Sequence, residues 1–214
     1  RANAALNPDA RYRDPITVAD VVESAAIATP LHLYDCCVVT DSGGAFVLAS
    51  RERAERLSRK PVWMLGFGEA VGQMQMNQMA DLTATAAVRS GRDAFATSGM
   101  KPDEIDCAQL YDSFTITLVM LVEEIGFAPR AGAASRARAG DFSPDGSLPL
   151  NTHGGLLSFG HCGVAGGMAH AVEAWRQMTG QAGERQIRAP RCAFVHADGG
   201  VMSSHVSLLL ARED

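Results

Sequence analysis

The chain has 214 residues, is 47% apolar and 20% charged, and carries a formal net charge of −5. This length and composition fit one globular domain or one large half of a two-part fold. The acidic balance excludes a general nucleic-acid-binding protein, which needs clustered Lys and Arg. No apolar run is long enough to span a membrane, and the five cysteines lack metal-binding spacing. We therefore expect a cytoplasmic protein with reduced thiols and no metal.

The first fifty residues predict one helix and one interrupted strand. Thr17 is placed to cap a helix over residues 18–28, which Pro30 ends. A strand is expected over residues 33–50, interrupted by an Asp-Ser-Gly-Gly turn. Its second arm, residues 45–49, is continuously apolar, as in strands that are covered on both faces.

The next fifty residues predict a strand and a helix that pack together. Residues 61–71 form an apolar strand candidate with two glycines, and residues 78–98 show a helical pattern rich in alanine, which allows close packing on a sheet. The basic run before this strand, residues 51–60, predicts a solvated loop or helix. The methionines after the strand are assigned to the core or to an apolar tunnel wall: Met74, Met76 and Met79.

A second strand and helix follow the turn at Pro102. Residues 105–110 predict a short strand, and residues 113–125 predict a helix that ends at Gly126. The stretch 128–150, rich in Gly, Ala, Arg and Ser, predicts a loop across the surface.

The end of the chain predicts a helix over residues 164–178 and two antiparallel strands, 192–197 and 205–211, joined by a Gly-rich turn. Strands that alternate with helices predict an α/β fold in which helices are layered on a mixed sheet.

The glycine-rich segment 151–170 is the most informative part of the sequence. Glycine is costly inside regular structure, so this cluster indicates a close backbone approach. His161 stands in it just before the expected helix, where unpaired N–H groups favour negative charge. Its imidazole is a candidate base or oxyanion donor, or makes only local hydrogen bonds. The neighbouring Cys162 is a weaker candidate, either a nucleophile with a lowered pKa or a small core residue.

Tyr111 stands where a predicted strand stops and a helix begins. Strand ends line the ligand crevice in α/β folds, so this phenol is a site candidate. The alternative is a half-buried aromatic side chain, since a phenol with a pKa near 10 is a poor base unless its environment tunes it. The next two residues, Asp112 and Ser113, are expected to cap the following helix.

The turn at 198–202 leaves two interpretations open. The backbone N–H groups of Gly199 and Gly200 form a nest for an oxyanion, or the segment is an ordinary hairpin turn. The remaining histidines of the later half are expected to be structural: His153, His170, His196 and His205.

Several ordered motifs resemble the C-terminal half of the thiolase superfamily, of the type grouped with sterol-carrier-protein thiolases and lipid-transfer proteins. The resemblance covers essentially the whole chain and rests on RANAALNP, LYDCC followed by DSGGAFVLAS, DEIDCAQLYDSF, LPLNTHGGLLSFGHCG and DGGVMSSH. It implies a layered α-β-α-β-α fold of two halves. Residues 1–33 would end the loop region of the front half, and residues 34–214 would form the C-terminal domain.

The resemblance also implies roles for individual residues. His161 matches the histidine that activates the family's nucleophilic cysteine and binds the thioester oxygen. Tyr111 stands where thiolases carry Asn or His. Gly199 and Gly200 match a late loop that carries a second catalytic cysteine in degradative thiolases, and no cysteine follows Cys192 here.

The implied substrate is an acyl-CoA thioester, with no other cofactor. Because His161 is retained, thiolase-type acyl transfer on a β-ketoacyl-CoA is favoured. Retro-aldol cleavage of a β-hydroxyacyl-CoA is the alternative, since some relatives with this tyrosine are aldolases. A non-catalytic acyl-CoA or lipid carrier and an inert structural half stay open. The implied partners are the missing N-terminal half with its nucleophilic cysteine, a second copy in a homodimer, and a small protein with an OB-fold and zinc ribbon.

Overall fold

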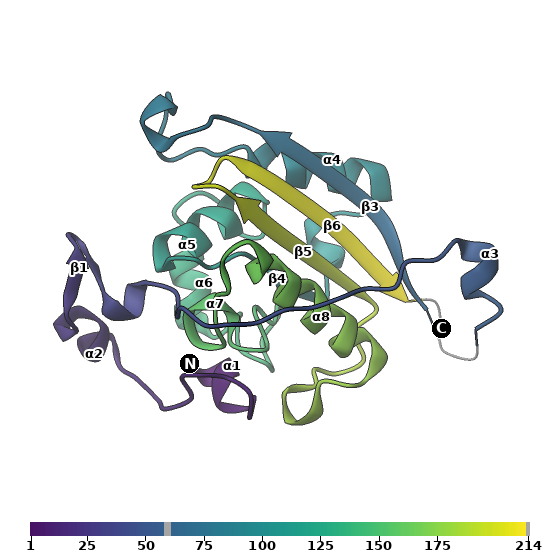
Figure 1. Cartoon of the computed structure of the whole chain (residues 1–214), viewed down its shortest axis with the longest axis horizontal. Helices are drawn as coiled ribbons and strands as arrows, with labels where there is room; N and C mark the ends of the chain where they lie inside the picture. Colours follow the sequence, from purple (N-terminus) through teal and green to yellow (C-terminus); the bar gives the residue numbers. More distant parts are fainter. Residues whose placement is uncertain (58–60, 213–214) are drawn as a thin grey trace.

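A four-stranded mixed sheet in the order β3-β6-β5-β4 forms the centre of the chain (Figure 1). The computed structural model describes residues 1–57 and 61–212. β6 pairs antiparallel with both β3 and β5, while β4 runs parallel to β5. This confirms the expected mixed sheet and its closing antiparallel pair. The strands are β3 Val62–Val71, β4 Cys107–Gln109, β5 Cys192–Gly199 and β6 Ser204–Arg212.

Helices cover both faces of this sheet. On one face α4 (Ala87–Ser98) and α5 (Thr115–Glu124) enclose a core that includes Phe194 of β5. On the other face α8 (Gly166–Thr179) packs Ala174 and its neighbours against β4, β5 and β6. Figure 1 shows α8 in front of the sheet and α4 behind it. The layers therefore follow the α/β expectation.

Two glycines let α4 lie directly on β3. A Cβ at Gly68 would stand 2.0 Å from the carbonyl oxygen of Ser90, and one at Gly66 would stand 2.4 Å from that of Ala94. Both helix residues are small, so the backbones approach closely. This confirms the close packing predicted from the alanine-rich helix pattern.

Short elements connect and flank these layers. A small two-stranded sheet stands apart from the main one. The remaining elements are the helices α1 Ala2–Ala5, α2 Val18–Glu23, α3 Arg51–Ala54, α6 Ala133–Ala139 and α7 Gly155–Ser158, the strands β1 Ala26–Ala28 and β2 Leu31–His32, and the 3-10 helices η1 Leu33–Asp35, η2 Met76–Gln78, η3 Pro102–Glu104, η4 Gly163–Ala165 and η5 Gly183–Arg185.

The predicted strand over residues 45–49 is wrong. These residues are extended but belong to no strand, and Val47 is 96% exposed. The segment crosses in front of α8 (Figure 1), where Gly44 lies against Met168. A strand needs a neighbouring strand for its backbone hydrogen bonds, and none of the described strands lies beside this one. Apolar side chains alone therefore did not make a strand.

The ends of several other elements differ from the predicted ones. Thr17 does cap α2 in a capping box with Asp20, but the helix ends at Glu23 and residues 26–28 pair with β2 instead. The helix predicted over 78–98 begins only at Ala87. The loop predicted over 128–150 contains α6. In the basic run Arg51–Ala54 forms a helical turn, which agrees with the predicted loop or helix. Residues 58–60 of that run lie outside the described residues.

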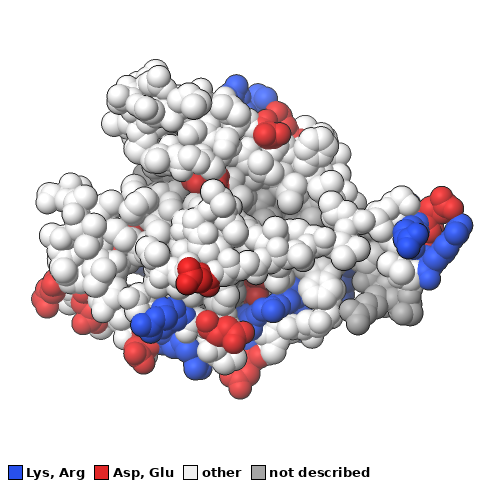
Figure 2. All heavy atoms as spheres, in the orientation of Figure 1, with Lys and Arg blue, Asp and Glu red and all other residues white. Residues whose placement is uncertain are grey.

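The methionines after β3 do not line a core. Met74 is 81% exposed and Met76 is 39% exposed, so the core alternative is wrong for them, while the apolar tunnel wall stays a prediction. Figure 2 shows a broad face with few charged side chains over the sheet, whereas charges gather along one margin and around α3.

Candidate active site

The structure brings Tyr111 and His161 together across fifty residues of sequence. The tyrosine lies just after β4, and the histidine just before α8. Tyr111 Oη is 2.7 Å from His161 Nε2, and the two rings meet edge to face with centroids 5.6 Å apart. Tyr111 is 7% exposed and His161 is half-buried. The pair is therefore formed in the folded chain and is reached from the side of the imidazole.

The hydrogen bonds of His161 fix its tautomer. The backbone N–H of Gly163 donates to His161 Nδ1 at 3.2 Å, so Nδ1 holds a lone pair. Burial lowers the pKa of His161, which keeps the imidazole neutral near pH 7. Its one proton therefore lies on Nε2 and is donated to Tyr111 Oη. The tyrosine accepts this bond, and its own O–H is left to donate to another acceptor.

The phenol keeps its proton over the physiological pH range. Burial raises the pKa of Tyr111 far above 10, and the negative charge of Asp198 adds to the effect. A phenol with a raised pKa is a proton donor rather than a base. The pair therefore presents a single oriented O–H donor whose oxygen is already bound by an imidazole.

Backbone links hold the two side chains in place. The side chain of Asn151 accepts from Leu110 N at 2.7 Å and donates to Leu110 O at 2.8 Å, which fixes the residue before the tyrosine. The backbone of His161 is bracketed by the segment after η1: His161 N donates to Val38 O at 2.6 Å, and Thr40 N donates to His161 O at 3.0 Å. These links join three distant parts of the sequence.

Asp112 and Ser113 do not cap α5, so that prediction is wrong. The N-cap of α5 is Phe114, with no side-chain cap. Asp112 turns inward instead and accepts from Leu156 N at 2.7 Å and Leu157 N at 3.3 Å, in the first turn of α7. Burial raises the pKa of Asp112 to about 7 in spite of these bonds.

The start of α8 forms one wall of the site. A Cβ at Gly166 would stand 3.3 Å from both Tyr111 Oη and His161 Cδ2. A Cβ at Gly167 would stand 2.6 Å from that of Ala197. The glycine cluster thus allows backbone to approach the reactive pair, as the sequence indicated.

Of the three other predicted site residues, Cys162 adjoins His161 in the sequence, while Gly199 and Gly200 lie in the hairpin between β5 and β6. Cys162 is half-buried and precedes the 3-10 helix η4. Gly199 ends β5 and Gly200 lies in the hairpin turn with φ +68°, where Ser203 N donates to Gly199 O at 3.2 Å. This hairpin approaches the pair through Ala197.

Two of the histidines that were expected to be structural are buried close to the reactive pair. His170 is fully buried in α8, with its ring centroid 6.2 Å from that of Tyr111 and 5.1 Å from that of His153. Neither ring has a hydrogen-bond partner among the residues that the structure describes. Burial lowers the pKa of His153 to about 3 and that of His170 far below its usual value.

Two cavities lie beside α8, and neither is lined by Tyr111 or His161. One, of about 120 Å³, has His153, Glu173 and Arg176 among its lining residues. The other, of about 560 Å³, lies between the loop after α1 and the end of α8. Among residues 1–57 and 61–212, no cluster of His, Cys, Asp and Glu is arranged to hold a metal ion. Within the same ranges no helix is long and apolar enough to cross a membrane.

Comparison with known proteins agrees with this arrangement. Residues 68–212 match the family described as "Thiolase C-terminal domain-like". The chain belongs to this family. Its fold is thus that of a thiolase-like domain.

Individual relatives cover nearly the whole chain. An acetyl-CoA acetyltransferase of Methanothermobacter thermautotrophicus is 32% identical over 92% of the chain and 52% of its own length. A steroid side-chain-cleaving aldolase of Thermomonospora curvata is 37% identical over 82% of the chain and 46% of its own length. The solved Ltp2-ChsH2(DUF35) aldolase is 32% identical with a TM-score of 0.86, over 99% of the chain and 56% of its own. The chain thus spans about half the length of these relatives, and both predicted reactions are represented among them.

Proposed function

We propose that this chain carries the carbon–carbon cleavage site of a CoA-thioester enzyme, and that its reaction is the retro-aldol cleavage of a β-hydroxyacyl-CoA. The observation that carries this proposal is the Tyr111–His161 pair, with an oriented phenol O–H and no free imidazole nitrogen. Such a pair suits a step in which negative charge grows on an oxygen atom.

Retro-aldol cleavage produces such an oxygen. The β-hydroxyl gives its proton to a base, for which the carboxylate of Asp198, whose charge acts on Tyr111, is the candidate. The hydroxyl carbon becomes a carbonyl, the Cα–Cβ bond breaks, and its electron pair moves into the thioester as an enolate. Return of the proton from this base to Cα completes the shortened acyl-CoA. Tyr111 donates its O–H to the enolate oxygen, and His161 holds the phenol oxygen in place. Binding the charge as it forms lowers the barrier.

The choice of the aldol reaction over acyl transfer rests on His161. A thiolase-type mechanism asks this imidazole to take a proton from a cysteine, which needs a nitrogen with a free lone pair. Here Nδ1 is occupied by Gly163 N–H and Nε2 by Tyr111. The two aldolase relatives support this choice, and the steroid named for one of them supports a bulky acyl group as substrate.

Thiolase chemistry is the second candidate. It is favoured by the presence of a histidine at position 161 and by the acetyl-CoA acetyltransferase relative. In this reaction Tyr111 would move away from Nε2 and free the imidazole to serve a cysteine. That cysteine would come from the N-terminal half expected from the resemblance or, less directly, be Cys162.

A substrate comparison tests the proposal. The full-length protein is incubated either with a β-hydroxyacyl-CoA or with a β-ketoacyl-CoA plus CoA, and products are followed by mass spectrometry. We expect a carbonyl compound and a shortened acyl-CoA from the first mixture only. Products from the second mixture alone would establish the thiolase. Tight acyl-CoA binding with no products from either would establish the carrier.

Tyr111→Phe tests the assigned donor. Loss of the O–H is expected to lower kcat by about 100- to 1,000-fold with a smaller change in KM, because the bond strengthens in the transition state. Tyr12→Phe is the matched control, since Tyr12 packs edge to face on Tyr34 far from the pair along the chain. Equal activity of Tyr111→Phe and the wild type would exclude the phenol as donor.

The partners follow from the same proposal. The extended apolar residues 45–49 would complete a sheet with the N-terminal half that the resemblance implies. Residues 1–33 would close the loop region of that half, and a second copy would form the homodimer. The Ltp2-ChsH2(DUF35) complex supports a small partner protein, for which an OB-fold and zinc ribbon remain the expectation. No cofactor beyond the CoA thioester is needed for the cleavage.

A further inference from the structure

Asp112 ties together the two segments that carry the reactive pair. Its carboxylate belongs to the loop of Tyr111, yet it binds the amides of Leu156 and Leu157 in the turn that leads to His161. On the other side of the tyrosine, Asn151 binds Leu110 in the same way. The residues before and after Tyr111 are therefore each held by hydrogen bonds to the segment 151–157, which leads to His161.

The carboxylate is held without freedom to move. Asp112 is 2% exposed, and a Cβ at Gly155 would stand 2.0 Å from Asp112 Oδ2. Gly155 also has φ +64°, so a larger residue is strained there for a second reason. The anion therefore fills the space that a side chain at position 155 would occupy.

This arrangement is costly for folding. The ionisable side chains that face Asp112 are those of Tyr111, Cys37 and His170. His170 Nε2 is 3.5 Å from Asp112 Oδ1, but burial keeps this imidazole neutral, so it provides no charge. A buried carboxylate without a cation is unfavourable even when amides bind it. An asparagine at this position would avoid the cost of the charge.

We infer that Asp112 is a positioning residue, whose buried anion fixes Tyr111 against His161 at the expense of folding stability. It touches no reacting atom, and it acts through the amides of α7. A residue kept only for stability would not leave a charge in this place. The inference rests on the proposed function for its catalytic readout, but its structural readouts do not depend on any substrate.

Asp112→Asn in the full-length protein tests this inference, with Asp106→Asn as the matched control. Asp106 also accepts two backbone amides, Arg191 N at 2.7 Å and Cys192 N at 2.9 Å, but it lies before β4, at the end of that strand away from Tyr111. Unfolding by denaturant at pH 8, hydrogen–deuterium exchange of the peptide 153–161, and kcat with KM are measured for both variants.

We expect Asp112→Asn to unfold at an equal or higher denaturant concentration, to exchange faster in peptide 153–161, and to lose at least about tenfold in kcat with little change in KM. Asp106→Asn should unfold at a lower concentration and keep its kcat. Loss of both stability and activity in Asp112→Asn would make it a structural residue. Unchanged exchange and unchanged kcat would overturn the inference. If the wild type cleaves no β-hydroxyacyl-CoA, the proposed function fails, while the exchange and unfolding results still decide the role of Asp112.

Discussion

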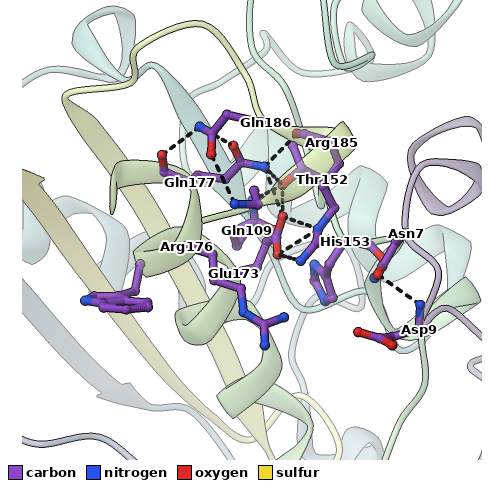
Figure 3. Close-up of polar contacts among 12 residues, drawn as sticks. Asn7, Asp9, Gln109, Thr152, His153, Glu173, Arg176, Gln177, Arg185 and Gln186 are labelled. Atoms are coloured by element: carbon purple, nitrogen blue, oxygen red, sulfur yellow. Dashed lines mark hydrogen bonds and ion pairs between the residues drawn. The ribbon is translucent and has the colours of Figure 1, made fainter. Parts of the chain in front are cut away.

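Two buried polar clusters lie along α8, and they differ in how completely their hydrogen bonds are made. The cluster on the second half of the helix is built around the Glu173–Arg185 ion pair, with N–O distances of 2.9 to 3.1 Å (Figure 3). Thr152 and Gln177 bind the same carboxylate. The cluster near the start of the helix contains Asp112 and the histidines at 153 and 170, whose imidazole nitrogens have no hydrogen-bond partner.

The two clusters therefore contribute differently: the Glu173 cluster stabilises the packing of α8, and the Asp112 cluster lies beside the reactive pair. Apart from Gln109 Oε1, the side-chain groups of the Glu173 cluster are paired, which stabilises a single packing of α8 on β4. The Asp112 cluster keeps unpaired polar groups beside the reactive tyrosine. Unpaired buried groups cost stability and persist where they serve a site. Substitutions in the Glu173 cluster should therefore lower folding stability, whereas substitutions in the Asp112 cluster should affect activity first.

The largest effect is expected from Arg185→Met. It leaves Glu173 buried without its cation, and removal of one partner of a buried ion pair typically costs about 3–5 kcal/mol. The free energy of unfolding, measured by denaturant titration, should fall by this amount. Arg176→Met, also on the side of α8 that borders the cavities, is the control and should stay within about 0.5 kcal/mol, since Arg176 forms no ion pair with the described residues. If Arg185→Met lowered the free energy of unfolding by less than about 1 kcal/mol, this would contradict the stabilising role assigned to the Glu173 cluster.

Acid should destabilise the fold, although the buried histidines and the buried carboxyls have opposite effects on stability. His153, His170 and His196 have lowered pKa values, so between pH 6.5 and about 4.5 they are neutral in the folded protein and protonated when unfolded. Asp112 and Asp198, with pKa values raised to about 7, do the reverse. His161 and His205 also have lowered pKa values, and Glu124 has a raised one. The histidines outnumber the carboxyls, so the unfolded state binds more protons and the free energy of unfolding should fall as the pH is lowered.

Denaturant titrations at several pH values between 4.5 and 6.5 measure this slope. Asp112→Asn removes one opposing group and should steepen it. A stability that is constant or rises toward low pH would show that the buried histidines become protonated in the folded chain.

The smallest effect is expected from His153→Phe. Its ring nitrogens have no partner, and it lines the 120 Å³ cavity, which leaves room for the larger ring. Removal of unpaired polar atoms should raise the free energy of unfolding by about 1 kcal/mol. The neighbouring Thr152→Val is the matched control in the paired cluster, because it loses bonds to Gln109, Glu173 and Gln177 and should cost about 1–3 kcal/mol. If the free energy of unfolding changed in the same direction and by a similar amount in both variants, the two clusters would not differ in their effect on stability.

Much of the fold could be predicted from patterns that act locally. The apolar runs predicted β3, β5 and β6, and helical spacing that ends at a glycine predicted α5 and α8. The glycine cluster at 151–170 indicated the site, because glycines there are needed wherever backbone approaches Tyr111 and His161. Residues 45–49 show the limit of such patterns: an apolar run becomes a strand only beside another strand.

The amino-acid sequence by itself determined the strands β3, β5 and β6, the helices α5 and α8 and the place of position 161 before a helix, since these depend on neighbours along the chain. Only the tertiary structure decided what Asp112 binds, which nitrogen of His161 carries the proton, and which buried groups stay unpaired. Each of these depends on donors and acceptors about forty or fifty residues away, and on burial, which changes proton affinities only after the chain has folded around them.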